Sequence, residues 1–405
     1  MLRLCFFISA LLALLPCRAA VLSLEQCVDS ALARNPALAA AALSVERARI
    51  LKATAFNPPM TEISLKQETT GGGGPENGVF FGQEFDFPTL YLARHKSLEA
   101  RRALEADRFG ALLAEVRGQV GSIFYSLLYS RELLRLNASL DSLYGEFCRV
   151  ASVRLEQGDV GPLELMNARR LREKNEMERQ AELSRYQSLL RDLQRVTGCV
   201  SLPEPADVPF GPIVSTVADF DFATSSRGRV AAGELAVAER EYAEARNEFL
   251  PGIRLGATVQ ALIRSFNPYN VERLPFAKGN FMGFEVGVTV PLFFGAQSAR
   301  LKAADAQRRI SLLDMQSAEV EASSEILKLR SLLSSDAARL EYYRSTALPQ
   351  AREIRRVATV SYEFGDISYI EYISNMETAA AVFREYASCV DSYNQTLLRL
   401  ESLSR

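Results

Sequence analysis

The apolar residues of the chain follow two different periods. In four segments, apolar and polar residues alternate, which is typical of β-strands with one apolar and one polar face. These segments are 60–69, 79–87, 252–263 and 282–290. Elsewhere apolar residues recur at every third or fourth position, as they do in amphipathic helices. The pattern therefore predicts a mixed α and β chain with long helices and two β-hairpins, at 60–87 and 252–290.

The predicted strands share the same chemistry on each face. One face carries aliphatic and aromatic residues, and the other carries glycine, threonine and charged residues. The charged residues of the polar face include Lys66, Glu84, Asp86, Arg254 and Glu285. A segment of about ten residues with these faces suits a tilted transmembrane barrel strand, apolar toward lipid and polar toward a water-filled lumen. A soluble hairpin that caps a helical bundle is the alternative.

The helical period is sustained longest in residues 91–157, which contain no proline. A helix of this length would span about 100 Å, far beyond an ordinary globular helix, and this implies a coiled-coil or barrel arrangement. A returning helix is predicted at 162–197. The second half repeats the plan with helices at 228–249, 298–358 and 368–402, of which the long one contains Pro349.

A short motif at the end of each long helix occurs twice, at a constant offset. Its members are Gly158, Asp159 and Glu164 in the first copy and Gly365, Asp366 and Glu371 in the second. A Gly-Asp pair between two helical segments predicts a helix C-cap, a tight reversal and a new helix. The chain therefore contains two long helical hairpins with equivalent tips.

The two copies of this plan define the expected domains. Residues 21–201 form the first repeat, 202–213 a proline-rich linker, and 214–405 the second repeat. The first repeat opens with a capping box from Ser23 to Gln26, and its first helix stops near Asn35-Pro36. Residues 1–20 resemble a secretory signal, with cleavage after Ala19 or Ala20. The sequence leaves open whether Cys17 carries a lipid.

Composition narrows the chemistry. The net charge of −2 does not favour nucleic-acid binding, and the single histidine, His95, excludes a histidine-rich metal cluster. No catalytic set or phosphate-binding loop is apparent, so the sequence predicts neither an enzyme nor a cofactor. Without tryptophan, a membrane-interface belt would consist of tyrosine and phenylalanine. Four separate thiols are expected after export, although a Cys27–Cys199 disulfide stays open.

The strands require an oligomer if they span a membrane. Four strands cannot close a barrel, since the smallest membrane barrels have about eight. An open sheet edge in lipid would leave backbone N–H and C=O groups without partners. Several copies of the chain must therefore complete the sheet.

This order of features resembles the TolC-like outer-membrane efflux proteins. The resemblance rests on the Asn35-Pro36 helix stop, the duplicated Gly-to-acid tip, and prolines that bracket each hairpin. These prolines are Pro58, Pro88, Pro251 and Pro291. It implies a homotrimer in the outer membrane of a Gram-negative bacterium, with a 12-stranded barrel in lipid and an α-helical barrel in the periplasm. It also implies docking to a periplasmic adaptor protein and an inner-membrane transporter. The short linker and C-terminal tail imply a reduced equatorial domain.

The resemblance also gives the tips a role. It implies that the helix turns close the periplasmic entrance and that Glu371 and Glu164 ring the pore, with Asp366 and Asp159 nearer the turn. Three identical carboxylates around an axis would repel one another and attract cations. Ser368 and Glu371 also have capping-box spacing, and Glu164 follows Pro162 in a helix's first turn. Gate and helix cap are both open interpretations.

The leading functional interpretation is a passive duct of a tripartite efflux or secretion system. Loops 70–78 and 265–280 would then face the outside of the cell. The alternative is a periplasmic coiled-coil adaptor or tether, which would explain the helices but not the alternating strands. The sequence does not identify the exported substrate, the class of pump, or whether the cargo is a small molecule or a polypeptide.

Overall fold

The computed structural model describes residues 21–69, 75–158, 160–215, 219–260 and 282–404. The described residues form two compact units. The helical unit draws on 1–41, 109–228 and 319–405, and the sheet unit on 42–108 and 229–318. The predicted signal segment 1–20, Cys17, Asp159 and the predicted loop 265–280 lie outside the described residues. Because each unit contains segments from both predicted repeats, the division at 202–213 stays a proposal.

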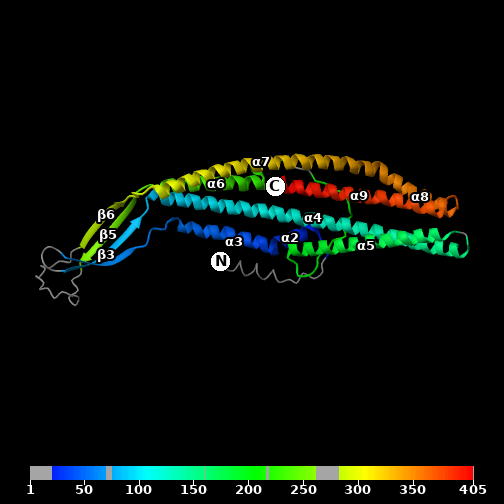
Figure 1. Cartoon of the computed structure of the whole chain (residues 1–405), viewed down its shortest axis with the longest axis horizontal. Coiled ribbons are helices and arrows are strands. Elements are labelled where there is room, and N and C mark those ends of the chain that lie inside the picture. Colours follow the sequence, from blue (N-terminus) through cyan, green and yellow to red (C-terminus); the bar gives the residue numbers. More distant parts are fainter. Residues whose placement is uncertain (1–20, 70–74, 159, 216–218, 261–281, 405) are drawn as a thin grey trace. The chain divides into compact units, whose positions relative to one another are not determined.

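The helical unit consists of antiparallel helical hairpins (Figure 1). Its elements are α2 (Leu24–Arg34), α5 (Pro162–Thr197), η3 (Tyr343–Ala347), α8 (Leu348–Glu363) and α9 (Tyr369–Ser404), with most of α4 (Pro88–Glu156) and the end of α7 (Gly295–Tyr342). Helices α4 and α5 meet at one turn, and α8 and α9 meet at another. The predicted long helix at 91–157 and its return at 162–197 are confirmed. No helix among the described residues has both the length and the apolar character needed to cross a membrane.

Local signals set the helix ends as the sequence predicts. In the capping box of α2, Gln26 N–H donates to Ser23 Oγ at 3.3 Å and Ser23 N–H donates to Gln26 Oε1 at 2.9 Å. Helix α5 ends at Gly198, whose φ of 65° is left-handed. A Cβ at Gly198 would also lie 2.9 Å from the carbonyl oxygen of Arg34, so both conformation and space require glycine there.

The core of the helical unit lies between α2, α4 and α5. Phe124, Leu127 and Leu193 are almost fully buried there, and Cys27 and Ala31 of α2 pack against the same cluster. Burying one such large side chain contributes about 1.5–3 kcal/mol. A second cluster lies near the tips and a third around Val390 of α9. These clusters hold together helices that the sequence predicts individually.

One predicted helix is interrupted. The sequence predicts a single helix at 298–358, but η3 is a π-helical segment between α7 and α8. Leu348 N–H bonds to the carbonyl of Tyr343, five residues earlier, directly before Pro349. A proline lacks an N–H donor and crowds the preceding turn, so a π-turn there accommodates it without ending the helix.

The segment between the two predicted repeats contacts the helical unit. The short strands β1 (Val21–Leu22) and β4 (Glu204–Pro205) pair in parallel, which the sequence analysis did not predict. The fully buried Asn394 of α9 donates to Gly211 O at 3.0 Å and accepts from Ile213 N–H at 2.8 Å. A short 3-10 turn, η2 (Phe222–Thr224), then precedes α6 (Ser226–Asn247).

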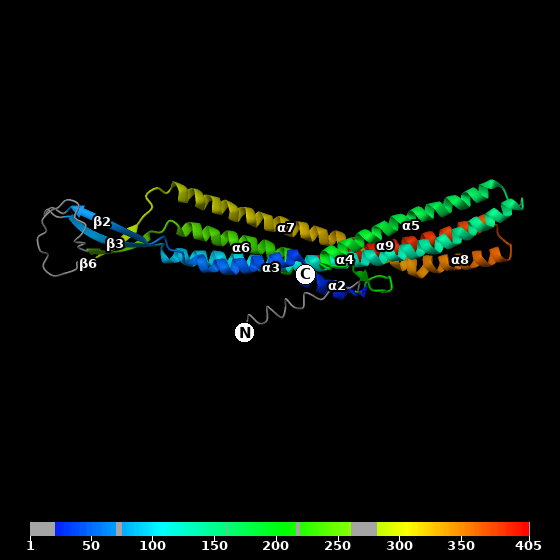
Figure 2. The same cartoon turned by 90° about the horizontal axis from the view of Figure 1, so that it is seen from below.

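The sheet unit contains one antiparallel sheet of four strands in the order β2-β3-β5-β6. The strands are β2 (Glu62–Thr69), β3 (Pro75–Phe85), β5 (Gly252–Gln260) and β6 (Met282–Thr289), visible as adjacent arrows in Figures 1 and 2. Both predicted hairpins are confirmed. The β3–β5 pairing, which joins them into one sheet, was not predicted.

Strand β3 differs from its predicted range at both ends. It begins at Pro75, inside the predicted loop, because its pairing with β2 continues to Thr69. It ends at Phe85, so Asp86 lies beyond the strand. The expectation that Asp86 belongs to the polar strand face is therefore wrong: its carboxylate pairs with Arg94 Nη1 at 2.7 Å.

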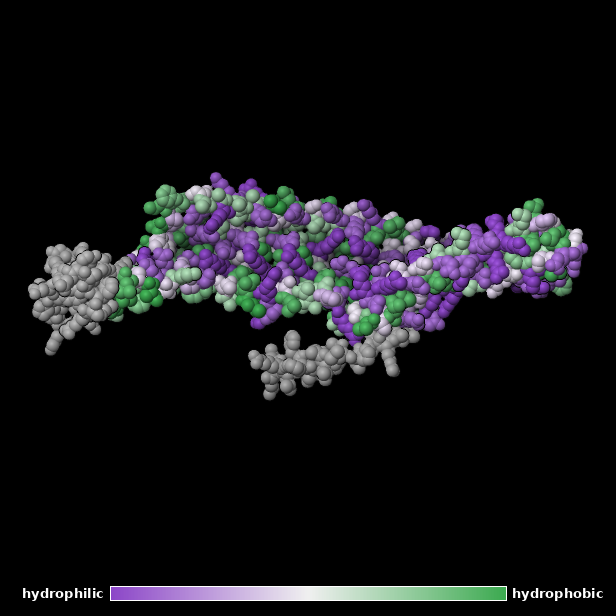
Figure 3. All heavy atoms as spheres, turned by 60° about the horizontal axis from the view of Figure 1, so that its bottom comes forward, coloured by the Kyte–Doolittle hydropathy of each residue, from purple (hydrophilic) through white to green (hydrophobic). Residues whose placement is uncertain are grey.

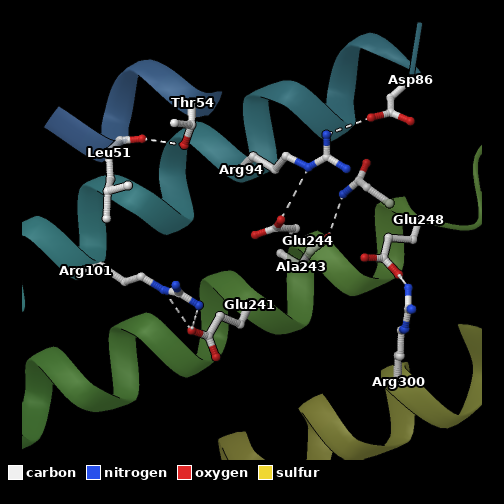
Figure 4. Close-up of polar contacts among 11 residues, drawn as sticks. Leu51, Thr54, Asp86, Arg94, Arg101, Glu241, Ala243, Glu244, Glu248 and Arg300 are labelled. Atoms are coloured by element: carbon white, nitrogen blue, oxygen red, sulfur yellow. Dashed lines mark hydrogen bonds and ion pairs between the residues drawn. The ribbon is translucent and has the colours of Figure 1, made fainter. Parts of the chain in front are cut away.

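Ion pairs join the helices next to the sheet (Figure 4). Helix α3 (Pro36–Leu51) continues into a 3-10 turn, η1 (Lys52–Ala55), and packs in the sheet unit with α6 and parts of α4 and α7. Arg94 of α4 reaches both Asp86 and Glu244, at 2.7 and 3.6 Å. Arg101 pairs with Glu241 at 2.6 Å, and Arg300 of α7 with Glu248 at 3.4 Å. These contacts connect α4, α6 and α7 at the base of the strands.

Candidate functional site

The two tips have the same backbone geometry. Gly158 and Gly365 have φ values of 80° and 79°, in the left-handed region that favours glycine. Gly365 N–H bonds to Tyr362 O at 3.1 Å, and Asp366 N–H bonds to Ser361 O at 2.8 Å. Gly158 N–H bonds likewise to Leu155 O at 3.1 Å. The predicted C-caps and reversals at both glycines are confirmed.

Glu371 forms the capping box that its spacing predicts. Its carboxylate Oε2 accepts from Ser368 N–H at 2.8 Å, and its own N–H donates to Ser368 Oγ at 3.3 Å. These bonds to Ser368, the backbone one first, lower the pKa of the exposed Glu371 carboxyl from its ordinary value. The side chain therefore caps α9, and its role as a gate remains a prediction.

The other predicted tip residues have different surroundings. Glu164 is half-buried in the first turn of α5, and its Oε1 has no hydrogen-bond partner among the described residues. Asp366 is exposed, and only its backbone contributes to the turn. Among the described residues, Ser368 is the only partner of the Glu371 side chain, and a ring of identical carboxylates would need further copies of the chain.

Four aromatic residues beneath the second tip were missed by the sequence analysis. Tyr362 of α8 stacks on Tyr372 of α9 with ring centres 4.9 Å apart. Tyr369 lies 4.9 Å from Tyr362 and 4.6 Å from Phe147 of α4. Burial raises the pKa of the Tyr369 phenol, whose Oη has no hydrogen-bond partner in the described part of the chain. The cluster fixes the α8–α9 turn against the end of α4. The spacing of three tyrosines around Gly365 was the available signal.

Apolar side chains are exposed at the turns. Leu163 is 74% exposed in the first tip and Phe364 is 79% exposed in the second. Met166 and Ile370 are also exposed nearby. In Figure 3, green atoms gather at the end of the helical unit that carries the turns. The tip is therefore an apolar surface with acidic residues in it.

The sheet has one apolar face and one polar face, as predicted. The strand register places Ile63, Phe81, Ala257 and Phe284 in one row across the four strands, and Leu65, Val79, Val259 and Met282 in another. The opposite face carries the row Glu62, Gly82, Gly256 and Glu285. Phe284 is 80% exposed and Val286 79% exposed. A sheet with such a face exposes more apolar surface than a soluble domain normally does.

Among the residues whose side chains the structure describes, each face contains an exception. Gln83 lies on the apolar face, where its amide accepts from Thr61 Oγ1 at 2.5 Å and donates to Pro59 O at 2.8 Å. Phe80 lies on the polar face and is only 1% exposed. The sequence pattern leaves the face of Phe80 unassigned, because this residue stands within an apolar run of three residues that hides the alternation. The polar face is thus not uniformly polar.

Aromatic residues gather where the strands join the helices. Phe249 and Phe294 stack with ring centres 6.3 Å apart, and Phe56 lies 4.9 Å from Tyr91. Phe293, four residues after the end of β6, is 90% exposed. Phenylalanine and tyrosine are the residue types that the sequence offers for a membrane-interface belt, and such a belt stays a prediction.

The described residues contain neither a disulfide nor a group of metal-ligating side chains. Cys27, Cys148, Cys199 and Cys389 form no disulfide, which agrees with the expected separate thiols. The described residues contain no group of histidine, cysteine and carboxylate side chains that could hold a metal ion.

Comparison with known proteins gives a family-model match over part of the chain and a shared fold. Residues 229–404 match the family model described as outer membrane efflux protein. The comparison with curated proteins gave no match.

Several solved structures share the fold. A membrane protein from Pseudomonas aeruginosa has a TM-score of 0.79 at 15% identity, covering 94% of this chain and 93% of that chain. The CmeC outer membrane channel of Campylobacter jejuni has a TM-score of 0.76 at 15% identity, covering 94% and 85%. The MtrE outer membrane channel of Neisseria gonorrhoeae, in its open state, has a TM-score of 0.75 at 16% identity, covering 94% and 88%.

Long helical hairpins combined with a four-stranded sheet of one apolar face form a fold that this chain shares with solved outer-membrane channels. Residues 229–404 also match the family model of outer membrane efflux proteins. The predicted resemblance to TolC-like proteins is therefore confirmed. The family-model match and the shared fold both point to outer-membrane efflux channels, and they do not favour the periplasmic adaptor or tether.

Proposed function

We propose that the chain is the outer-membrane duct of a tripartite efflux or secretion system and that it works without catalysis. The observation that carries this proposal is the sheet, whose apolar face is exposed and whose opposite face carries charges and glycines. Water would fill the space lined by the polar face, and lipid would cover the apolar one. Substrate would pass from a pump and adaptor to the outside.

Three copies would complete the barrel. Strands β2 and β6 form the two edges of the four-stranded sheet. In lipid, unpaired backbone groups along these edges cost several kcal/mol each, so β6 of one copy would pair with β2 of the next. The resemblance implies three copies, which gives 12 strands, a number well within the range of membrane barrels.

The helical hairpins would cross the periplasm and present the tips to the other components. The exposed Leu163 and Phe364 offer apolar contact area at the turns. A periplasmic adaptor and an inner-membrane transporter are the expected partners. We propose that Glu371 and Glu164 line the closed entrance, with Asp159 and Asp366 beside the turns, and that their carboxylates attract cations.

The mass of the native particle tests this proposal. Protein extracted in detergent should give a particle of three mature chains that migrates anomalously on gels unless heated. Removal of the detergent should cause aggregation, because the apolar face of the sheet would meet water. A folded monomer that is stable in buffer alone would overturn the duct and favour the soluble alternative.

A further inference from the structure

A glycine trough on the polar face of the sheet holds the ring of Phe80. Gly82 and Gly256 are register partners on β3 and β5. A Cβ at Gly82 would lie 2.7 Å from Phe80 Cε1, and a Cβ at Gly256 would lie 2.9 Å from Phe80 Cε2. Both distances are shorter than carbon atoms tolerate. The ring therefore lies flat against the backbone only because both positions lack a side chain.

Arg254 covers this ring and connects the two edges of the sheet. Its guanidinium carbon lies 5.7 Å from the centre of the Phe80 ring, within cation–π distance. Its Nη2 is 3.1 Å from Glu62 Oε2 on β2, and its Nε is 3.8 Å from Glu285 Oε1 on β6. One guanidinium thus joins carboxylates from both edge strands and fixes them over the aromatic ring.

The cluster carries an excess of negative charge. Glu84 lies opposite Arg254 in the β3–β5 register, next to the row that contains Glu62 and Glu285. The four side chains supply three carboxylates and one guanidinium, so their net charge is −2 at neutral pH. The Glu62 and Glu285 side chains are half exposed, and charges next to a low-dielectric wall attract counterions into a pore.

We propose that this Phe80–Arg254 cluster, defined by Glu62, Phe80, Gly82, Glu84, Arg254, Gly256 and Glu285, is a permeation filter within the β-domain that favours cationic solutes. The inference rests on the proposed function, in which the polar face lines the lumen. The trough keeps the Phe80 ring out of the pore and thereby determines the width of the pore. The carboxylates set its charge preference, and Arg254 positions them. The filter is separate from the carboxylates at the helical tips.

Substitutions of opposite charge test the preference. Channels of purified trimer in planar bilayers should show cation selectivity in a KCl gradient. Glu285→Gln and Glu62→Gln each remove a negative charge, so the reversal potential should move toward the value of an anion-selective channel. Arg254→Gln removes the positive charge, so the reversal potential should move toward the value of a more cation-selective channel. Arg300→Gln removes a guanidinium that pairs with Glu248 beside the helices, and should leave the reversal potential unchanged.

Substitutions in the trough test the width. In Gly256→Ala the new methyl group should push the Phe80 ring off the sheet and lower the single-channel conductance. Gly283→Ala on the same face is the matched control, because its Cβ would meet only Thr258 Cβ at 3.8 Å, an ordinary contact. The double variant Gly256→Ala/Phe80→Ala has no ring to displace and should recover the wild-type conductance.

The outcomes separate the inference from the function on which it depends. A wild-type preparation that forms no channel overturns the proposed function. If the trimers conduct but Arg254→Gln and Glu285→Gln shift the reversal potential in the same direction, or do not shift it, the proposed filter is wrong. A conductance loss in Gly256→Ala that persists after removal of Phe80 overturns the role of the trough. Opposite shifts with recovery in the double variant support it.

Discussion

At the scale of single residues, Glu371 has one role that its contacts show and one that we propose. It caps α9 through Ser368, and three copies would line the closed entrance of a trimer. Since a helix cap acts on folding and a pore charge acts on ion flow, one substitution separates the two roles.

Glu371→Gln keeps the size of the side chain and removes its charge. If the gate is correct, the trimer should lose part of its cation selectivity and its block by polyvalent cations in bilayer recordings. A cap alone predicts unchanged selectivity with a slightly lower melting temperature. Selectivity identical to that of wild type would therefore contradict the gate.

The pH dependence of the cap has a defined sign. The pKa of Glu371 is lowered in the folded chain, so its carboxylate stabilises the fold above the ordinary pKa of glutamate, about 4.3, and this contribution is lost as the pH falls through the folded value. The difference in melting temperature between wild type and Glu371→Gln should therefore shrink below about pH 4. A difference that grows in acid would contradict the capping role.

Substitutions of Tyr369 test whether its ring, and not its hydroxyl, stabilises the aromatic cluster. It is 2% exposed, and its hydroxyl has no hydrogen-bond partner among the described residues. Tyr369→Phe should therefore leave the free energy of unfolding unchanged or raise it. Tyr369→Ala should cost about 3–5 kcal/mol, the range for removing a large aromatic side chain from a core. Chemical unfolding in detergent measures both, and a large loss in Tyr369→Phe would contradict the contact analysis.

At the scale of elements, the helix turns and the edge strands of the sheet determine how the chain is arranged. The helices are long because no proline or glycine cap interrupts their period. The chain reverses direction where a glycine adopts a left-handed φ, at Gly158 and Gly365. Pro349 shows that an interruption need not end a helix, because the π-turn η3 absorbs it.

Gly158→Ala and Gly365→Ala should each destabilise the protein by about 1–2 kcal/mol, the cost of a left-handed conformation for a residue with a Cβ. Gly145→Ala is the control. Gly145 lies inside α4, and a Cβ there meets nothing within 4 Å. That substitution should stabilise α4 by roughly 0.5–1 kcal/mol. Equal effects at Gly145 and Gly365 on thermal unfolding would contradict the assigned turn geometry.

At the scale of the whole molecule, the exposed apolar face of the sheet would be stabilised by contact with lipid. Strands β2 and β6 at the edges call for further copies of the chain, because their outer backbone groups have no partner within the sheet. Lipid contact and oligomerisation are therefore linked in the proposed duct.

Val286→Arg places a charge on the apolar face of β6 and should cost about 2–4 kcal/mol near the middle of the bilayer. The yield of heat-modifiable trimer in outer-membrane fractions should fall. Thr258→Arg places the same charge on the polar face of β5 and should leave assembly intact. Equal yields for both variants would show that lipid does not cover the predicted face.

The sequence by itself determined the features that depend on local geometry. The period of apolar residues assigned the helices and strands, because side chains on a strand alternate and those on a helix return every 3.6 residues. Gly158 and Gly365 marked the turns, since only glycine adopts their φ without strain. The capping box at Ser368 and the two faces of the sheet followed from spacing alone.

Only the tertiary structure decided which distant segments meet. Strand β5 pairs with β3, Asn394 fixes the linker, and the tyrosines around Gly365 form one cluster with Phe147. Local period cannot specify such contacts, because they depend on the shapes that two remote segments present to each other. Phe80 illustrates this most clearly. Its own neighbours left its face unassigned, and Gly256 on another strand provides half of the space that its ring occupies.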